Sequence, residues 1–355
     1  MKTITLFTSI LLPLTLALAE ELPAIKLGAV YSLSSWAAVG GISELNATKM
    51  AIDEINAKGG ILGRKIEISV EDNQSDLNKT VTAIQKLKSI NNVQIILGPN
   101  WAEFSDVAAP ICNKNKMLML TASGYTKDLT KDKTFIFTSL PSHSLMTAPM
   151  SDYIFKIGHK KIAMATSVSA YFESNAQAIK EQLKEKGISL TSESTWNPGQ
   201  ADFKSYITKL KGDGYDAVIL MLMEGGDLAA FLRQAKELRF AGQIYSSNAV
   251  LYDHVIEKSP ALSEGIICYE YRTLAPKEFL DRYAALYGSA ASHSIPRAYD
   301  NVYLLKDAIE RCKTDEPEKL KDCLRASDYK GVTGRIRFTE SGNVITQGQQ
   351  SALYK

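Results

Sequence analysis

The sequence lacks the motifs that would identify an enzyme, a metal site or a nucleic-acid-binding protein. Its 355 residues include four histidines and four cysteines, and no C-x-x-C, G-x-S-x-G, H-E-x-x-H or Walker sequence occurs among them. The formal charge is only +2, and without a block of Lys and Arg no strong field favours nucleic acid. We therefore expect no metal, no cofactor, no nucleic-acid partner and no catalysis, although a catalytic triad is assembled in space and need not leave a motif.

The four histidines do not form a recognisable motif with acidic or nucleophilic residues. We expect each of them at the surface: His143, His159, His254 and His293.

Long apolar runs are also missing, except for one at the N-terminus. Lys2 precedes an apolar stretch at 4–18, and Ala17-Leu18-Ala19 matches the small-residue pattern of a signal-peptidase site. No later run reaches the roughly 18 residues of a membrane span. We expect a cleaved signal peptide of residues 1–19 and a soluble protein exported to the periplasm. A buried N-terminal helix is the alternative, which Pro13 disfavours.

The cysteines are too few and too scattered for a zinc site, but an exported protein can form disulfides. Cys312 ends one helical pattern and Cys323 lies in the next, across the turn-forming segment 314–317. We expect these two to be bonded. Cys112 and Cys268 lie in apolar surroundings and are expected to be buried thiols.

What the sequence does have is a regular alternation of predicted strands and helices. One series runs from the strand at 25–31 to the strand at 117–120, and a second begins after Pro141. Strands separated by helices form parallel sheets with right-handed crossovers, so two series predict two doubly wound lobes. In such sheets ligands bind beyond the carboxyl ends of the strands.

The glycine-rich segment 59–63 does not change this interpretation. It follows a helical pattern and precedes a strand, whereas a dinucleotide-binding fingerprint has its glycines between a strand and a helix. We interpret it as a turn.

Several of these segments resemble the periplasmic leucine/isoleucine/valine-binding family. The resemblance rests on 25–30 (IKLGAV), 51–66 (AIDEINAKGGILGRKI) and 71–76 (EDNQSD). Shorter matches follow in family order at 96–99, 216–218, 232–235, 298–300 and 331–338. The resemblance implies an α/β protein with the type I periplasmic-binding fold, in which two doubly wound parallel-sheet lobes are joined by a three-segment hinge. Lobe 1 would hold 22–141 plus 271–330, and lobe 2 would hold 142–270 plus 331–355.

The function implied by the resemblance is that of a solute-binding protein. Such a protein captures an amino acid, an amide or a related carboxylate between its lobes, and closure follows because the solute adds contacts only in the closed state. The expected partner is the permease of an ABC importer in the inner membrane, and the protein is expected to be a monomer. A periplasmic sensing module that presents its ligand state to a receptor or kinase remains the alternative, since one fold serves several functions.

The resemblance also places candidate ligand-binding residues at the strand-end loops. In lobe 1 these are Ser34, Trp36, Trp101, Ala102, Glu103, Ser123 and Tyr125, and in lobe 2 they are Tyr171, Met223, Glu224 and Asn248.

Two of these positions depart from the family pattern. Ala102 aligns with a serine that binds ligand, and Asn248 aligns with an acid that faces the ammonium group. Glu224 offers an acid nearby, although it could instead cap the helix that begins near Asp227. With Trp36 and a second tryptophan at cleft loops, the ligand could be aromatic, amide-like or a carboxylate; either tryptophan could also belong to a lobe core.

Overall fold

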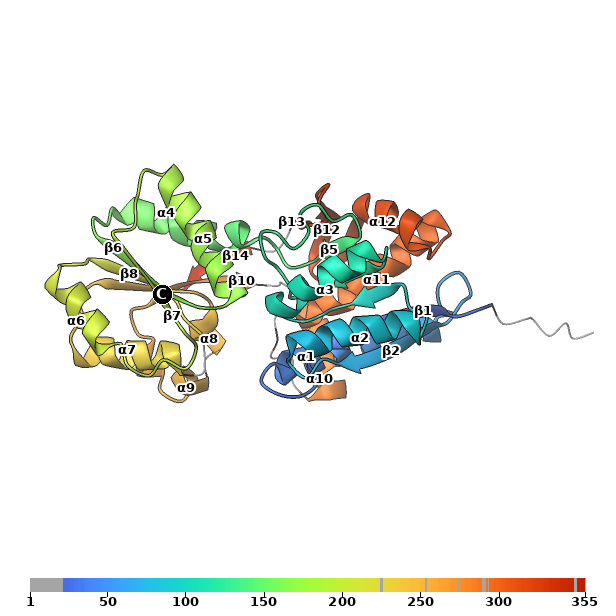
Figure 1. The fold of residues 1–355 in the computed structure, drawn as a ribbon, viewed down its shortest axis with the longest axis horizontal. Helices are drawn as coiled ribbons and strands as arrows, with labels where there is room; N and C mark the ends of the chain where they lie inside the picture. The colour runs from blue at the N-terminus through green and yellow to red at the C-terminus, as the bar shows by residue number, and fades with distance from the viewer. Residues whose placement is uncertain are drawn as a thin grey trace, which may run out of the picture.

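The computed structural model of the protein describes residues 22–223, 226–252, 254–272, 275–288, 292, 294–347 and 350–354. Figure 1 shows two lobes side by side, connected by segments that pass between them. The expected signal peptide lies outside the described residues. In the part of the chain that the structure describes, no helix is both long and apolar enough to cross a membrane.

Lobe 1 is built on a parallel sheet with the strand order β2-β1-β3-β4-β5. The strands are β1 (Ile25–Tyr31), β2 (Ile66–Asp72), β3 (Ile95–Leu97), β4 (Leu118–Thr121) and β5 (Ile136–Thr138). The helices are α1 (Ala38–Ala57), α2 (Leu77–Ser89), α3 (Ala102–Lys114), α10 (Lys277–Tyr287), α11 (Ile295–Cys312) and α12 (Pro317–Arg325).

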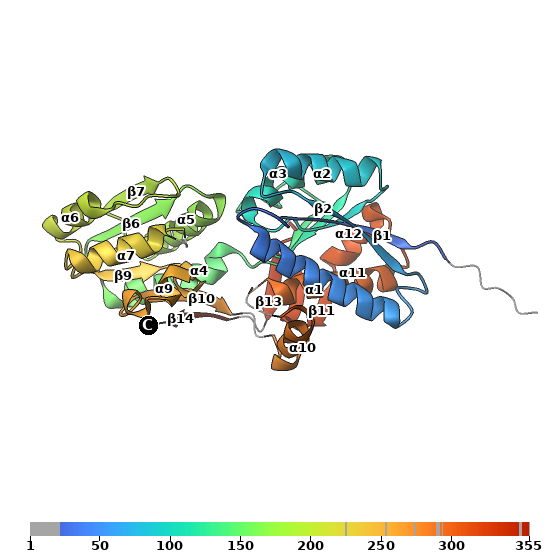
Figure 2. The same ribbon diagram turned by 90° about the horizontal axis from the view of Figure 1, so that it is seen from below.

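Helices cover both faces of this sheet, because successive side chains of a strand point to opposite faces. Ile95 and Leu97 pack with α1, α10 and α11 on one face. Ile96, between them in the sequence, packs with α2 and α3 on the other face. Figure 2 shows α2 and α3 on one side of the sheet, with α1 and α11 on the opposite side. Burial on both faces explains why β1, β3 and β4 are almost continuously apolar.

Lobe 2 repeats this architecture with the strand order β14-β10-β9-β8-β6-β7. All neighbours are parallel except β10 and β14. The strands are β6 (Ile162–Ser167), β7 (Ser192–Trp196), β8 (Ala217–Met221), β9 (Gln243–Ser246), β10 (Ile267–Arg272) and β14 (Gln350–Tyr354). The helices are α4 (His143–Ile157), α5 (Ala170–Glu185), α6 (Lys204–Gly212), α7 (Asp227–Glu237), α8 (Ala249–Tyr252) and α9 (His254–Glu257), with a 3₁₀ turn at Pro260–Leu262.

The C-terminal segment is divided between the lobes, which corrects the expected assignment of 331–355 to lobe 2. The strands β11 (Asp328–Gly331), β12 (Gly334–Phe338) and β13 (Val344–Gln347) form a small antiparallel sheet. Ile336 and Phe338 alternate on β12 and enter the core of lobe 1, where the Phe338 ring lies 5.2 Å from that of Phe137. These apolar side chains gain burial on lobe 1, so only β14 continues into the sheet of lobe 2.

The described chain therefore passes between the lobes after β5, after β10 and after β13. This arrangement, with its two parallel-sheet lobes, confirms the fold class expected from the sequence.

The buried Asp300 fixes the position of the small sheet. It lies on α11, and its carboxylate accepts hydrogen bonds from the backbone amides of Val332 and Thr333 and from the Thr333 hydroxyl. Burial raises the pKa of Asp300 to about 6. A side chain at Gly331 would collide with this carboxylate, since an added Cβ would lie 2.3 Å from its oxygen. Asp300 is therefore a structural residue.

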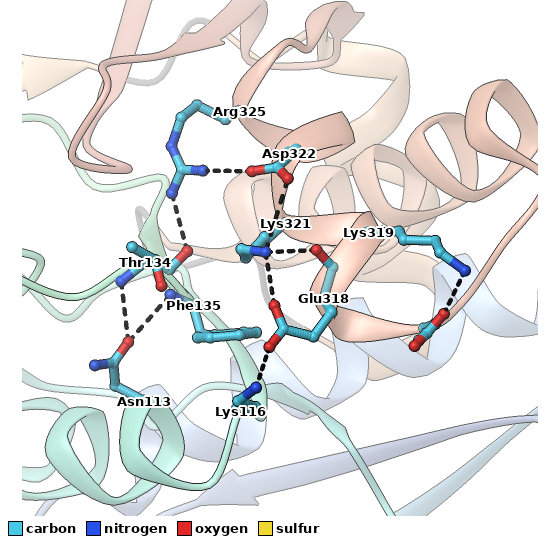
Figure 3. Close-up of polar contacts among 10 residues, drawn as sticks. Asn113, Lys116, Thr134, Phe135, Glu318, Lys319, Lys321, Asp322 and Arg325 are labelled. Carbon is cyan, nitrogen blue, oxygen red and sulfur yellow. Dashed lines mark hydrogen bonds and ion pairs between the residues drawn. The ribbon is translucent and has the colours of Figure 1, made fainter.

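The helix α12 is attached to the edge of lobe 1 by polar contacts (Figure 3). Glu318 pairs with Lys116 and Lys321, and Arg325 donates to the backbone carbonyl of Thr134. A disulfide between Cys312 and Cys323 joins α12 to the end of α11, as the sequence predicted. Cys112 and Cys268 are buried thiols.

Candidate functional site

The carboxyl ends of the two sheets lie at the contact between the lobes. Glu103, just after β3, accepts a hydrogen bond of 2.6 Å from the hydroxyl of Ser169, just after β6. Lys127, in the loop after β4, forms an ion pair of 2.8 Å with Glu181 on α5. Because β1, β3 and β4 are neighbours, as are β6, β8 and β9, the loops that follow them gather at this contact.

The two predicted tryptophans form one aromatic surface on lobe 1. Trp36 follows β1 and Trp101 precedes α3, and their ring centroids lie 5.1 Å apart in an edge-to-face arrangement. Trp36 also contacts Phe104 and remains 57% exposed. Trp101 has a φ of 68°, an unusual value for a bulky residue. The structure thus places an exposed indole at the edge of the site, and neither ring belongs to one of the buried lobe cores.

Asp72, at the end of β2, fixes the loop that follows the neighbouring strand β1. The Ser34 hydroxyl donates to one carboxylate oxygen at 2.7 Å, and the backbone amides of Leu33 and Gln74 donate to the other. Desolvation alone would raise the pKa of Asp72, but these hydrogen bonds outweigh it and lower the pKa. Asp72 is therefore held in its charged form and accepts the one hydrogen bond that the Ser34 hydroxyl can donate.

A buried carboxylate, which the sequence did not indicate, lies behind the loop that follows β4. Glu44 on α1 is 1% exposed and accepts a hydrogen bond from the hydroxyl of Ser123. The hydroxyl oxygen of Ser123 in turn accepts from the backbone amide of Trp101 at 3.3 Å. Burial raises the pKa of Glu44 to about 7, opposed by hydrogen bonds from Ser123 and Ser294 and by the charge of Arg297.

Arg297 connects this buried group to the backbone of the site. It is itself 1% exposed, and its Nε donates to the carbonyl of Ala122 at 2.7 Å. Nothing in the sequence indicated that Glu44 and Arg297 lie close enough to interact, because they lie in separate helices and each appears within an ordinary helical pattern.

The loop that follows β3 leads into α3, whose first turn places a carboxylate between the lobes. Ala102, the first residue of α3, is buried. One oxygen of Glu103 accepts the bond from Ser169, whereas its Oε2 is buried and has no hydrogen-bond partner among the described residues. One turn later, burial raises the pKa of Asp106, opposed by a hydrogen bond from Thr126. This end of α3 is therefore acidic.

Two of the predicted residues of lobe 2, Tyr171 and Asn248, are in contact. The Tyr171 hydroxyl donates to the side-chain oxygen of Asn248 at 3.4 Å, and the amide of Met223 donates to the hydroxyl of Ser167 at 3.0 Å. Glu224, the predicted acid of this lobe, lies outside the described residues.

Tyr125 meets lobe 2 through a histidine that we expected at the surface. His143 begins α4, is 1% exposed, and packs edge-on between the rings of Tyr125 and Tyr171 at centroid distances of 4.8 and 5.0 Å. Burial lowers its pKa to about 3, so the imidazole is neutral. The expectation was wrong because neighbours in the sequence do not report contact with a second lobe. A cavity of about 650 Å³ opens beside His143, between the loop 125–133 and α5.

The arrangement can hold a small molecule, and the described residues contain no group of three or more His, Cys, Asp or Glu side chains suited to a metal ion. It offers an aromatic surface, carboxylates in lobe 1 and an amide and phenol in lobe 2. Chemically, it is suited to binding by hydrogen bonds and stacking.

Comparison with known proteins agrees with this arrangement. The chain is 25% identical over 304 residues to the leucine-, isoleucine-, valine-, threonine- and alanine-binding protein of Pseudomonas aeruginosa, covering 83% of this chain and 80% of that one. It is 24% identical over 340 residues to the Leu/Ile/Val-binding protein of Escherichia coli K12, covering 93% and 89%.

Solved structures share the fold at low sequence identity. A branched-chain amino acid transporter substrate-binding protein of Streptococcus pneumoniae, in complex with isoleucine, superposes with a TM-score of 0.75 at 24% identity over 93% of this chain and all of that one. A solute-binding protein of an ABC transporter from Rhodopseudomonas palustris, in complex with 3,4-dihydroxybenzoic acid, gives 0.78 at 19% identity over 92% and 95%.

The family model described as periplasmic binding protein matches residues 24–352. That range includes both lobes and every candidate residue of the site. The chain belongs to the periplasmic binding protein family.

Proposed function

We propose that this protein captures a small solute between its lobes and delivers it to an ABC importer. The observation that carries the proposal is the meeting of the two carboxyl edges at Glu103 and Ser169, with the candidate side chains of both lobes around it. A solute that contacts both lobes stabilises the closed form by its differential affinity. No nucleophile–base pair is part of this proposal, and the protein acts by binding.

The importer is proposed from the relatives, whose names describe binding of leucine, isoleucine and valine, and from a solved structure whose name describes a solute-binding protein of an ABC transporter. The partner is then the permease in the inner membrane, and the protein works there as a monomer. The signal peptide proposed at 1–19 would bring it to the periplasm.

A screen of solutes by thermal shift tests this function. Amino acids, amides, amines and aromatic acids are added singly, and a solute present at 100 times its Kd should raise the free energy of unfolding by about 2.7 kcal/mol. We expect at least one class to shift the melting temperature and to bind with one-to-one stoichiometry in calorimetry. The absence of any shift across the screen, or turnover of a solute in place of stoichiometric binding, would contradict the proposal.

A further inference from the structure

The two candidate serine hydroxyls on lobe 1 are directed toward the lobe's own carboxylates. Ser34 donates to Asp72, and Ser123 donates to Glu44. A serine hydroxyl has a single proton, so neither group can donate to a bound solute while these bonds last. Ala102 has no hydroxyl at all. The Ser34 and Ser123 side chains therefore offer a solute oxygen lone pairs and no donated proton, and the Ala102 side chain offers neither.

One backbone amide of the loop after β3 is also engaged. The backbone N–H of Trp101 donates to the Ser123 oxygen at 3.3 Å. A helix N-terminus attracts anions, but the first turn of α3 contains its own acid, Glu103. The positive end of this helix therefore already has a negative side chain beside it.

Glu103 has an unused acceptor at the contact between the lobes. Its Oε1 is bound by Ser169, while Oε2 is buried without a partner among the described residues. Within that part of the chain, no Lys or Arg forms an ion pair with it. A buried carboxylate oxygen without a donor is unfavourable by more than a typical hydrogen bond contributes, so this position is suited to an incoming donor.

The aromatic surface also favours a positively charged group of the solute. Trp36 is 57% exposed and lies against Trp101, whose neighbour in the sequence is Ala102. The faces of indole rings attract cations. The loops after β1 and β3 thus combine exposed π-surface with a carboxylate.

We propose that lobe 1 holds a protonated amine of the solute, with Glu103 as its hydrogen-bond acceptor, and that lobe 1 does not hold a carboxylate. The inference rests on the proposed function, because it assigns a polarity to that same cleft. Glu103 thereby determines which solutes are accepted: the ammonium group is required, and a carboxylate is dispensable.

The test uses six probes that share two carbon skeletons. 2-Phenylethylamine, phenylalanine and 3-phenylpropionate form one series, and isopentylamine, leucine and 4-methylpentanoate form the other. Each is titrated calorimetrically into the wild-type protein at neutral pH. We expect the amine and the amino acid of at least one series to bind at least about tenfold more tightly than the matching acid, as one charge-assisted hydrogen bond implies.

Three variants separate the role of Glu103 in recognition from a role in structure. Glu103→Gln keeps an oxygen for Ser169 but removes the charge, and it should weaken amine binding by about tenfold or more. Ser169→Ala removes the same contact between lobes from the other side and should leave the preference for amine over acid unchanged. Glu67→Gln, at an exposed position of β2, should change neither.

The outcomes distinguish this inference from the function on which it rests. Acids that bind as tightly as the amines, or a preference that survives in Glu103→Gln, overturn the amine assignment and leave solute binding intact. If none of the six probes binds, the amine assignment fails as well. The proposed function fails only if the broader screen finds no bound solute.

Discussion

Ser123 donates its hydroxyl proton to Glu44, a carboxylate 79 positions earlier in the chain and fully buried beneath the strand-end loops. This one contact uses the single hydroxyl proton of Ser123, so the side chain can meet a solute only as an acceptor while the contact lasts. It also connects the binding edge of lobe 1 to a titratable group in its core. The pH dependence of stability should therefore report on the same residues that shape the site.

The contribution of Glu44 to stability should fall as the pH rises toward neutrality. The pKa of Glu44 is raised from 4.5 to about 7 by burial, so the folded protein binds this proton more tightly than the unfolded chain. The stabilisation is fully present below about pH 4.5 and is lost as the pH rises to about 7. Urea unfolding at pH 5, 6, 7 and 8 should show a loss with an upper limit of about 3 kcal/mol from this group.

Glu44→Gln is the matched variant, because the amide keeps an oxygen for Ser123 and cannot ionise. The stability of the wild type relative to this variant should fall between pH 5 and 7, because groups common to both proteins cancel in the comparison. These include Asp300, whose pKa is raised to about 6, and His143, whose pKa is lowered to about 3 and whose contribution therefore rises with pH in this range. Identical pH profiles for the variant and the wild type would show that Glu44 does not titrate in this range.

Solute binding should change the tryptophan emission. Trp36 is 57% exposed at the edge of the site, whereas Trp196 packs against Phe203 and Tyr206 in lobe 2. In a Trp196→Phe background the emission maximum should shift on binding, because closure or stacking changes the polarity around Trp36. Trp36→Phe in the same background should reduce the shift. A solute that binds by calorimetry without altering emission in either protein would place both cleft indoles away from the ligand.

The disulfide should contribute to stability and not to binding. It closes a short loop between Cys312 and Cys323, which are 11 positions apart, and Figure 1 places α12 on the side of lobe 1 away from lobe 2. The Cys312→Ser, Cys323→Ser protein should lose about 2 to 3 kcal/mol in chemical denaturation and keep its affinity for solute. The ion pairs of Figure 3 should keep α12 attached. A double variant as stable as the wild type would refute the structural role of the bond.

The ion pair between the lobes should matter little. Lys127 and Glu181 are 67% and 43% exposed, and exposed pairs are screened by water and salt. Glu181→Gln should change solute affinity by about fivefold at most, which is less than the loss expected for Glu103→Gln. A larger effect, removed by added salt, would mean that this pair governs closure.

The parts of the fold that could be predicted were those encoded by local pattern. The apolar strands 25–31 and 217–221 are buried on both faces, so their continuous hydrophobicity was sufficient to locate them. The small sheet β11–β13 was not foreseen, and its strands β12 and β13 were expected in lobe 2, whereas they pack on lobe 1. Its position depends on Asp300 and on Phe338 packing against Phe137, contacts between distant segments that no local pattern reports.

The sequence located the strand-end loops of the candidate site but not the direction of their hydrogen bonds. Strand ends located the loops of Trp36, Trp101 and Tyr171 because parallel sheets bring their carboxyl ends together. The direction in which Ser34 and Ser123 donate depends on Asp72 and on the buried Glu44. The sequence shows which groups carry protons, and only the packed structure shows where those protons go.

The central claim is that a solute held between the lobes closes them, and small-angle X-ray scattering measures this most directly. The radius of gyration is compared for the protein alone and for the protein saturated with the solute that gives the largest thermal shift. As a control, the wild type and Glu103→Gln are compared at one subsaturating concentration of the same solute. We predict a smaller radius of gyration for the saturated protein, and a smaller change for the variant at the concentration where its occupancy is lower. An unchanged radius of gyration at full saturation, with binding verified by calorimetry, would contradict closure around the solute.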